Sequence, residues 1–169
     1  MAAQKPVQLV NGVLTEVTAV DASTGASDAG KIVALNSSGL LDTSMMPAGL
    51  GVDINVFPAT ENLAAGDFVN IYNSSGTMSC RKADANGKPV HGFVTASVTS
   101  GQNASVIRRG TNSQLSGLTL GASYYLSGST PGAITTTVPT TSGHLVQFIG
   151  VAHSATALSF DFSNYVQRG

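Results

Sequence analysis

The stretch LTLGASYYLSGSTPGAITTTVPTTSGHLVQFIGV, residues 118–151, decides the fold class, because short β-type runs alternate in it with turns and almost no charge interrupts them. Its spacing predicts a strand over 122–127, a tight turn over 128–132, a polar lead-in over 133–138 and a buried strand over 145–151. The turns consist of Gly, Pro, Ser and Thr. Nothing in the stretch resembles an active site. It therefore indicates an all-β building block rather than a catalyst.

Strand-like runs of the same kind recur through the last two thirds of the chain. The further runs lie at 68–72, 78–82, 90–97, 104–108 and 158–162. Short strands at regular intervals favour a compact β-sandwich or a partly closed β-barrel. No window of about 11 residues sustains an apolar period of 3.6, so any helix is expected to be short. We therefore expect an all-β knob domain over 57–169.

The first part of the chain differs from the rest in its residue pattern and is predicted to form an extended arm over 1–56. It opens with VQLVNGVLTEV, in which Asn11-Gly12 separates two alternating runs. Asn and Gly tolerate the positive φ of a type I′ turn, so this predicts a β-hairpin pairing 7–10 with 13–17. The following polar segment, 21–30, reads as an ordered loop or a flexible arm.

The rest of the arm is predicted as short pieces. A short strand over 31–35 is followed by a turn over 37–39. Asp42 is then expected to cap one helical turn that ends at Pro47.

The arm carries too few large apolar residues to enclose a core of its own, so we expect it to lie on the rest of the chain or on neighbouring subunits. Strand addition by a hairpin is a common way to hold a neighbour. Met side chains can form adaptable contacts, but they also fill gaps in cores. The candidate residues for contact with a neighbouring subunit or another partner are Val7, Leu9, Val13, Leu14, Ile32, Leu35, Leu40, Leu41, Met45 and Met46.

The composition excludes some classes of partner. Charged residues make up 10% of the chain, against about 25% in typical soluble domains, so the surface is covered by small and hydroxyl side chains. Such a surface suits a protein that is arrayed against partners. The net charge of -1 gives no basic field for nucleic acid. The basic pairs 81–82 and 108–109 read as solvated strand ends.

Cysteine and hydropathy add two further expectations. Cys80 is the only cysteine, so no intramolecular disulfide and no cysteine-based metal cluster can form. No leader-like segment opens the chain and no apolar run approaches the length of a membrane span. The sequence predicts a soluble protein, made in the cytoplasm, that does not insert into a membrane.

Catalytic chemistry is thinly represented, and we predict no enzyme activity, no cofactor and no metal. His91, His144 and His153 have no carboxylate or second histidine at ligand-like spacing. The carboxylates fall mostly at turns, where Asp caps backbone N–H groups. The stretch 84–87 superficially resembles a calcium loop but lacks the remaining ligands. Tyr124-Tyr125 could offer a stacking platform for a sugar, although strand alternation sends one ring inward and one outward.

Four segments together resemble a known family: TGASDAGKIVALNSSGLLDTSMMPAGLG, ENLAAGDFVNIY, GLTLGASYYLSGSTPGAITTT and HLVQFIGVAHSATALSFDF. In their succession of turn and strand residues, these segments are similar to capsid-decorating (cement or head-fibre-like) proteins of tailed bacteriophages. The resemblance implies a non-enzymatic virion protein, a homotrimer, that binds the major capsid protein on the outside of the shell and stabilises it. It also implies that the arm is the anchor and that 57–169 forms a protruding knob.

Two other functions remain open at this stage. A related structural reading is a fibre or tail-associated subunit that contacts a host receptor. A reading from another class is a carbohydrate-binding β-module that uses the face of Tyr124-Tyr125.

Overall fold

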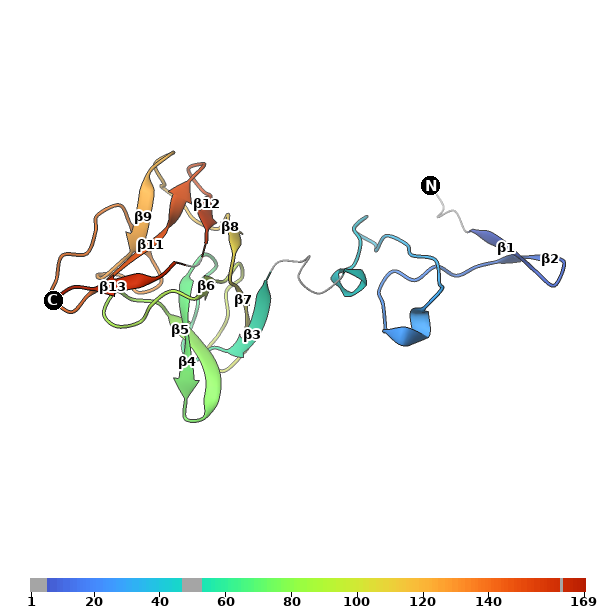
Figure 1. Ribbon diagram of the computed structural model, residues 1–169, viewed down its shortest axis with the longest axis horizontal. Helices are drawn as coiled ribbons and strands as arrows, with labels where there is room; N and C mark the ends of the chain where they lie inside the picture. Colours follow the sequence, from blue (N-terminus) through green and yellow to red (C-terminus); the bar gives the residue numbers. More distant parts are fainter. Residues whose placement is uncertain (1–5, 47–52, 162) are drawn as a thin grey trace. The chain divides into compact units, whose positions relative to one another are not determined.

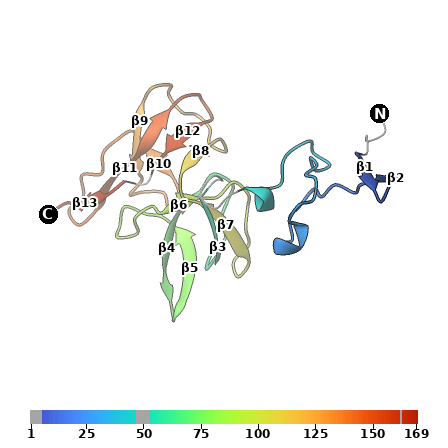
Figure 2. The ribbon, with the colours of Figure 1, turned by 45° about the vertical axis from the view of Figure 1, so that its right-hand side comes forward.

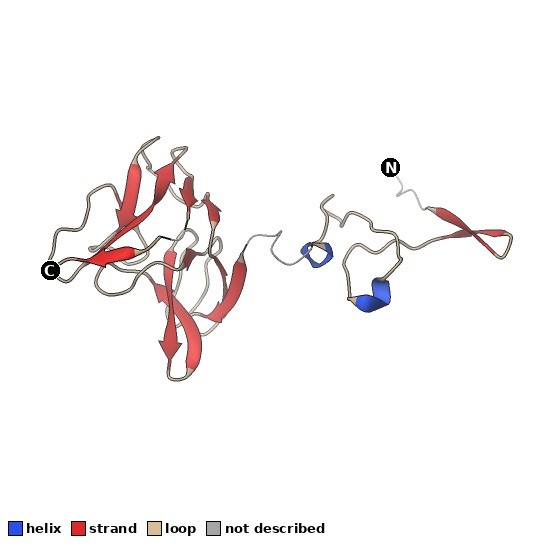
Figure 3. Ribbon diagram, in the orientation of Figure 1, coloured by secondary structure: helices blue, strands red, loops and turns tan. Residues whose placement is uncertain are grey.

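The computed structural model of the protein describes residues 6–46, 53–161 and 163–169. The chain divides into two compact units, Met1–Gly51 and Val52–Gly169, which we call the arm and the knob. The elements of each unit are labelled along the chain in Figure 1. Strands dominate, and the described helices are two single 3-10 turns (Figure 3).

The arm begins with the predicted β-hairpin. Strands β1 (Val7–Val10) and β2 (Val13–Glu16) are antiparallel, with Leu9 opposite Leu14. Asn11 and Gly12 adopt φ values of 50° and 83°, which is the left-handed conformation that a type I′ turn requires. The hairpin is therefore confirmed.

Local polar contacts give the remainder of the arm its turns. The 21–30 segment is an ordered loop that contains the 3-10 helix η1 (Ala26–Asp28). The second 3-10 helix, η2 (Thr43–Met45), starts beside Asp42, whose Oδ1 accepts a 2.9 Å hydrogen bond from Ser44 N, so the predicted cap is confirmed. Pro47, the predicted end of this turn, lies outside the described residues.

The predicted strand over 31–35 is wrong. Only one isolated parallel bridge forms there, between Val20 and Val33. Val20 N donates to Ile32 O at 2.9 Å, and Ala34 N donates to Val20 O at 2.8 Å. No longer ladder follows, because the chain turns at 37–39, where Gly39 N donates to Asn36 O at 2.9 Å. That turn is as predicted.

The knob is all-β, as predicted, and its two antiparallel sheets are consistent with a β-sandwich rather than a closed barrel. One sheet has the order β3-β7-β6-β4-β5, and the other has the order β10-β9-β11-β12-β8, with β13 pairing β11. The hairpin of β4 and β5 extends beyond the rest of the knob in both views (Figures 1 and 2). The first sheet consists of β3 (Ile54–Pro58), β4 (Phe68–Ser74), β5 (Thr77–Lys82), β6 (Gly92–Phe93) and β7 (Asn103–Ile107). The second consists of β8 (Gly110–Asn112), β9 (Ser123–Leu126), β10 (Ile134–Thr135), β11 (Leu145–Ala152), β12 (Leu158–Phe160) and β13 (Tyr165–Gln167).

Two boundaries differ from expectation. Because β3 pairs with β7 from Ile54 onward, residues 54–56 belong to the knob sheet rather than to the arm. The run 90–97 was expected to be one strand, but its strand, β6, has 2 residues. The chain leaves the sheet at Val94, whose N–H donates to Asp67 O at 3.0 Å and whose carbonyl accepts from Gly66 N at 2.8 Å.

The main core lies between the two sheets. Phe68, Phe93 and Phe160 meet there, with ring centroids 5.7 to 6.1 Å apart and each ring less than 3% exposed. A second cluster, which includes Val69 and Cys80, lies on the opposite face of the five-stranded sheet, because neighbouring residues of a strand point to opposite faces. The knob therefore has the hydrophobic core of an independently folding domain.

One buried amide ties the six-stranded sheet to the loop before β6. Gln147 on β11 is 0% exposed, and its Oε1 accepts a 2.7 Å hydrogen bond from Val90 N. Its Nε2 donates to Val90 O and to Ser163 O, each at 3.0 Å. The amide thus satisfies backbone groups that would otherwise be buried without partners.

Candidate functional site

The arm exposes the apolar residues that the sequence singled out as contacts. Of the ten candidates, Met45 is half-buried and the others retain between 40% and 74% of their surface in solvent. Sequence reasoning missed Val10 and Val33, which are also exposed. Every buried hydrophobic residue among those that the structure describes lies in the knob. Exposed apolar groups gathered in one segment are typical of interaction surfaces.

The hairpin presents an apolar row on each of its faces. Alternate residues of a strand share a face, and residues paired across the ladder share it too. Val7, Leu9 and Leu14 therefore lie on one face, and Val10 and Val13 lie on the other. Within the described part of the chain, no third strand joins this sheet. A two-stranded sheet alone is marginal in water, so the hairpin is suited to pairing with a partner.

Polar contacts, rather than a core, set the local shape of the arm. Asp28 accepts hydrogen bonds from the backbone N–H and the hydroxyl of Thr24, at 2.6 and 2.8 Å, and from Lys31 Nζ at 2.7 Å. The bond from Lys31 and those from Thr24 hold the pKa of the Asp28 carboxyl well below its usual range. The apolar side chains take no part in these contacts and stay available for a partner.

The titratable groups of the knob form no metal centre among the described residues. No cluster of three or more His, Cys, Asp or Glu side chains there could hold a metal ion. Asp84 has the turn role expected of it, since its Oδ1 accepts from Asn86 N at 3.0 Å. No helix in the described ranges is long and apolar enough to cross a membrane.

His91 has a structural position. Its Nδ1 accepts a hydrogen bond from Ile71 N at 2.9 Å, which replaces a strand partner for that amide. Burial of the ring and, to a smaller degree, the nearby Arg108 guanidinium lower the pKa of His91. The ring is therefore neutral at pH 7 and serves as a hydrogen-bond acceptor.

The two basic pairs differ in environment, and the prediction that all four residues are solvated strand ends is wrong for Arg81, Lys82 and Arg108, which are half-buried. Arg81 stacks on the Tyr72 ring at 4.0 Å, and Lys82 pairs with Asp67 at 3.3 Å. Arg109 is solvated and pairs with Asp161 at 2.8 Å. Arg108, by contrast, is half-buried in the wall of a cavity.

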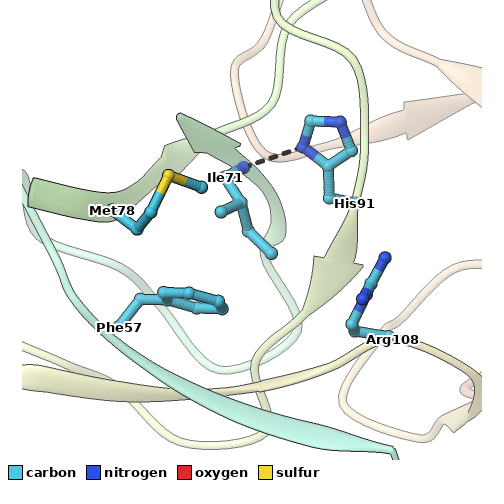
Figure 4. A pocket seen from close by; sticks show the side chains of 5 residues that line it. All are labelled: Phe57, Ile71, Met78, His91 and Arg108. Atoms are coloured by element: carbon cyan, nitrogen blue, oxygen red, sulfur yellow. Dashed lines mark hydrogen bonds between the residues drawn. The ribbon is translucent and has the colours of Figure 1, made fainter. Parts of the chain in front are cut away.

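That cavity has a volume of about 270 Å³ and is lined by Phe57, Ile71, Met78, His91 and Arg108 (Figure 4). The lining residues come from β3, β4 and β5 and from the segments that flank β6 and β7. Sequence reasoning missed it, because these positions converge only in the folded sheet. The Arg108-Arg109 pair was the one sequence feature that pointed to this region, but it did not show which of the two arginines lines the cavity.

The tyrosine pair divides as strand alternation predicts. Tyr124 is 6% exposed, and its hydroxyl accepts a 2.9 Å hydrogen bond from Thr119 N. Tyr125 lies on the other side of β9, and its ring meets the exposed Phe148 ring edge-on at 5.9 Å. The outer face of the six-stranded sheet thus carries one aromatic pair rather than a flat double-tyrosine platform.

No protein-family model matches the chain, and no curated protein is significantly similar to it. The arm and the knob are therefore interpreted from their own residues.

Proposed function

We propose that the protein is a structural virion protein that binds the outside of a phage capsid shell through its arm and stabilises the shell as a homotrimer. The arm is the anchor, and the major capsid protein is the partner. The knob is the part of each subunit that projects from the shell. No catalytic step belongs to this function.

The observation that carries the proposal is the contrast between the two units. The knob buries Phe68, Phe93 and Phe160 in a core of its own, whereas the arm buries none of its described leucines and valines and exposes most of them. Full burial of one such side chain contributes about 1.5 to 3 kcal/mol, so an arm with several of them gains its stability from a partner. The resemblance of the four quoted segments to decoration proteins supports the proposal that this partner is a capsid shell.

The low charge supports a contact made through apolar and hydroxyl groups. With 10% charged residues, few long charged side chains have to be desolvated or ordered when the arm is covered. Each contact can then be modest, because many subunits on one shell and several arms in one trimer add their effects.

The test compares the full chain with a knob variant that lacks residues 1–51. Both are titrated against shells assembled from the major capsid protein alone, and bound protein is measured after sedimentation. We expect the full chain to bind and the knob variant to remain in solution. Undiminished binding by the knob variant would contradict the anchoring role of the arm.

Two further measurements keep this result interpretable. Thermal unfolding of the knob variant is expected to match that of the knob in the full chain, and a large loss would mean that the arm lies on its own knob instead. Light scattering of the shell-bound and free protein is expected to show a trimer, at least on the shell. Electron micrographs showing the protein only on tails would support a fibre subunit and refute the capsid assignment.

A further inference from the structure

We propose that the knob cavity is a binding site for a small organic carboxylate, an anion carried on an apolar body about the size of one aromatic ring. This site is lined by residues of the knob. The proposed shell-binding function neither requires it nor predicts it.

The cavity exists because β6 is too short to fill the sheet. β6 pairs with β4 only at Phe68 and Val69, and with β7 only at Ile107. Beyond these pairs β4 and β7 have no strand between them, and Ile71 N donates to the His91 ring instead of to a strand carbonyl. Arg108 follows the last residue of β7 and therefore lies at this opening.

One side of the cavity is apolar. Phe57, Ile71 and Met78 line it, and Figure 4 shows Phe57 and Met78 across the opening from Arg108. An apolar cavity of about 150 Å³ holds a benzene molecule, so a volume of about 270 Å³ accommodates a ring with a short acidic substituent. The Met78 thioether can contact the edge of such a ring favourably.

The other side of the cavity carries a single positive charge. Arg108 is half-buried, and its guanidinium makes no hydrogen bond or ion pair with any residue that the structure describes. Among the other described arginines, Arg81 and Arg109 have side-chain partners, Asn70 and Asp161 respectively. A guanidinium offers five donors in a planar fork that matches a carboxylate. A bound carboxylate supplies the hydrogen-bond acceptors that no described residue offers to the Arg108 guanidinium.

The charge balance favours a carboxylate over a phosphate. His91 is neutral at pH 7 because its pKa is lowered, so Arg108 alone supplies positive charge to the cavity. One guanidinium balances one carboxylate, and the apolar wall accepts the remainder of the ligand. A dianionic phosphate would face Phe57 and Met78 without a second cation.

The experiment titrates the full chain with phenylacetate and follows backbone amide signals by NMR. We expect saturable shifts at Ile71 and Arg108, with a dissociation constant of about 1 mM or below. Phenylacetamide, which has the same shape without the charge, is expected to bind at least about tenfold more weakly. Equal binding of the acid and the amide, or the absence of saturable shifts, overturns the proposal.

Two variants locate the site. Arg108→Gln is expected to weaken phenylacetate binding at least about tenfold, whereas the matched change Arg109→Gln, one residue away in solvent, leaves it unchanged. Met78→Trp, at a position that is 52% exposed, places an indole ring over the opening and is expected to abolish binding without a loss of thermal stability. If Arg109→Gln weakens binding as much as Arg108→Gln does, or if Met78→Trp binds normally, the ligand does not occupy this cavity.

Discussion

The apolar face of the arm hairpin offers the most direct perturbation of shell binding. The double variant Leu9→Ser, Leu14→Ser removes a directly opposed leucine pair and keeps the Asn11-Gly12 turn that shapes the hairpin. Neither leucine is buried in the free protein, where they are 65% and 74% exposed. The change should therefore leave the folded knob intact and act only when a partner covers the hairpin.

The magnitude follows from the exposed fractions. Full burial of a leucine contributes about 1.5 to 3 kcal/mol, and the exposed fractions of 65% and 74% leave roughly 1 to 2 kcal/mol to be gained at each residue. Together the two leucines account for roughly 2 to 4 kcal/mol. Because about 1.4 kcal/mol corresponds to a tenfold change in affinity, we expect the double variant to bind each site roughly 30-fold to 1,000-fold more weakly.

The assay is a sedimentation titration of shells with the wild-type chain, the double variant and a matched control. The control is Leu120→Ser, Val166→Ser, because both of these knob residues are 71% exposed. It should bind like the wild type, and all three proteins should unfold at the same temperature. Equal affinity of the double variant and the wild type would refute the assignment of the hairpin as an anchor, and equal losses in both variants would refute its specificity.

Three predictions concern the knob, each checked by urea unfolding. Phe160→Ala should lower the free energy of unfolding by about 3 to 5 kcal/mol, since it empties the ring cluster between the sheets; a loss below about 1 kcal/mol would mean that the sheets do not pack there. Gly150→Ala should cost at least about 1 to 3 kcal/mol, because its Cβ would lie 2.0 Å from Ser159 O and the bulge in β11 would have to move; an unchanged midpoint would disprove this close approach. The pKa of His91 is lower in the folded state than in the unfolded state, so the unfolded chain binds more protons as the pH falls. Stability should accordingly be full above about pH 6.5 and decline below it, and His91→Asn should show a shallower decline between about pH 8 and pH 5; parallel curves would show that this histidine is not the group responsible.

The sequence predicts those parts of the fold that are determined by residues close together in the chain. Asn11-Gly12 adopts the conformation of its turn without outside help, and Asp42 caps the helical turn that directly follows it. The alternation at Tyr124-Tyr125 likewise depends only on the strand in which the pair lies. Local chemistry is sufficient in these cases.

The parts that escaped prediction depend on distant residues. The run 90–97 has the composition of one strand, but Val94 bonds to backbone groups of Gly66 and Asp67, and the strand stops. The short β6 that results creates the cavity, and it is the fold that separates Arg108 from its neighbour Arg109. No local pattern distinguishes two adjacent arginines, so this site could only be found in the structure.

The buried thiol of Cys80 is protected from oxidation and alkylation in the folded protein. Burial leaves the side chain 0% exposed and raises its pKa to about 11, so almost none of it is thiolate at neutral pH. An oxidant or an alkylating reagent can reach this sulfur only when the five-stranded sheet opens. Since the chain has no other cysteine, the rate of thiol labelling measures how often the knob opens. This measurement does not depend on what the arm is bound to. The same protection keeps subunits from being cross-linked by disulfides while the sheet stays closed.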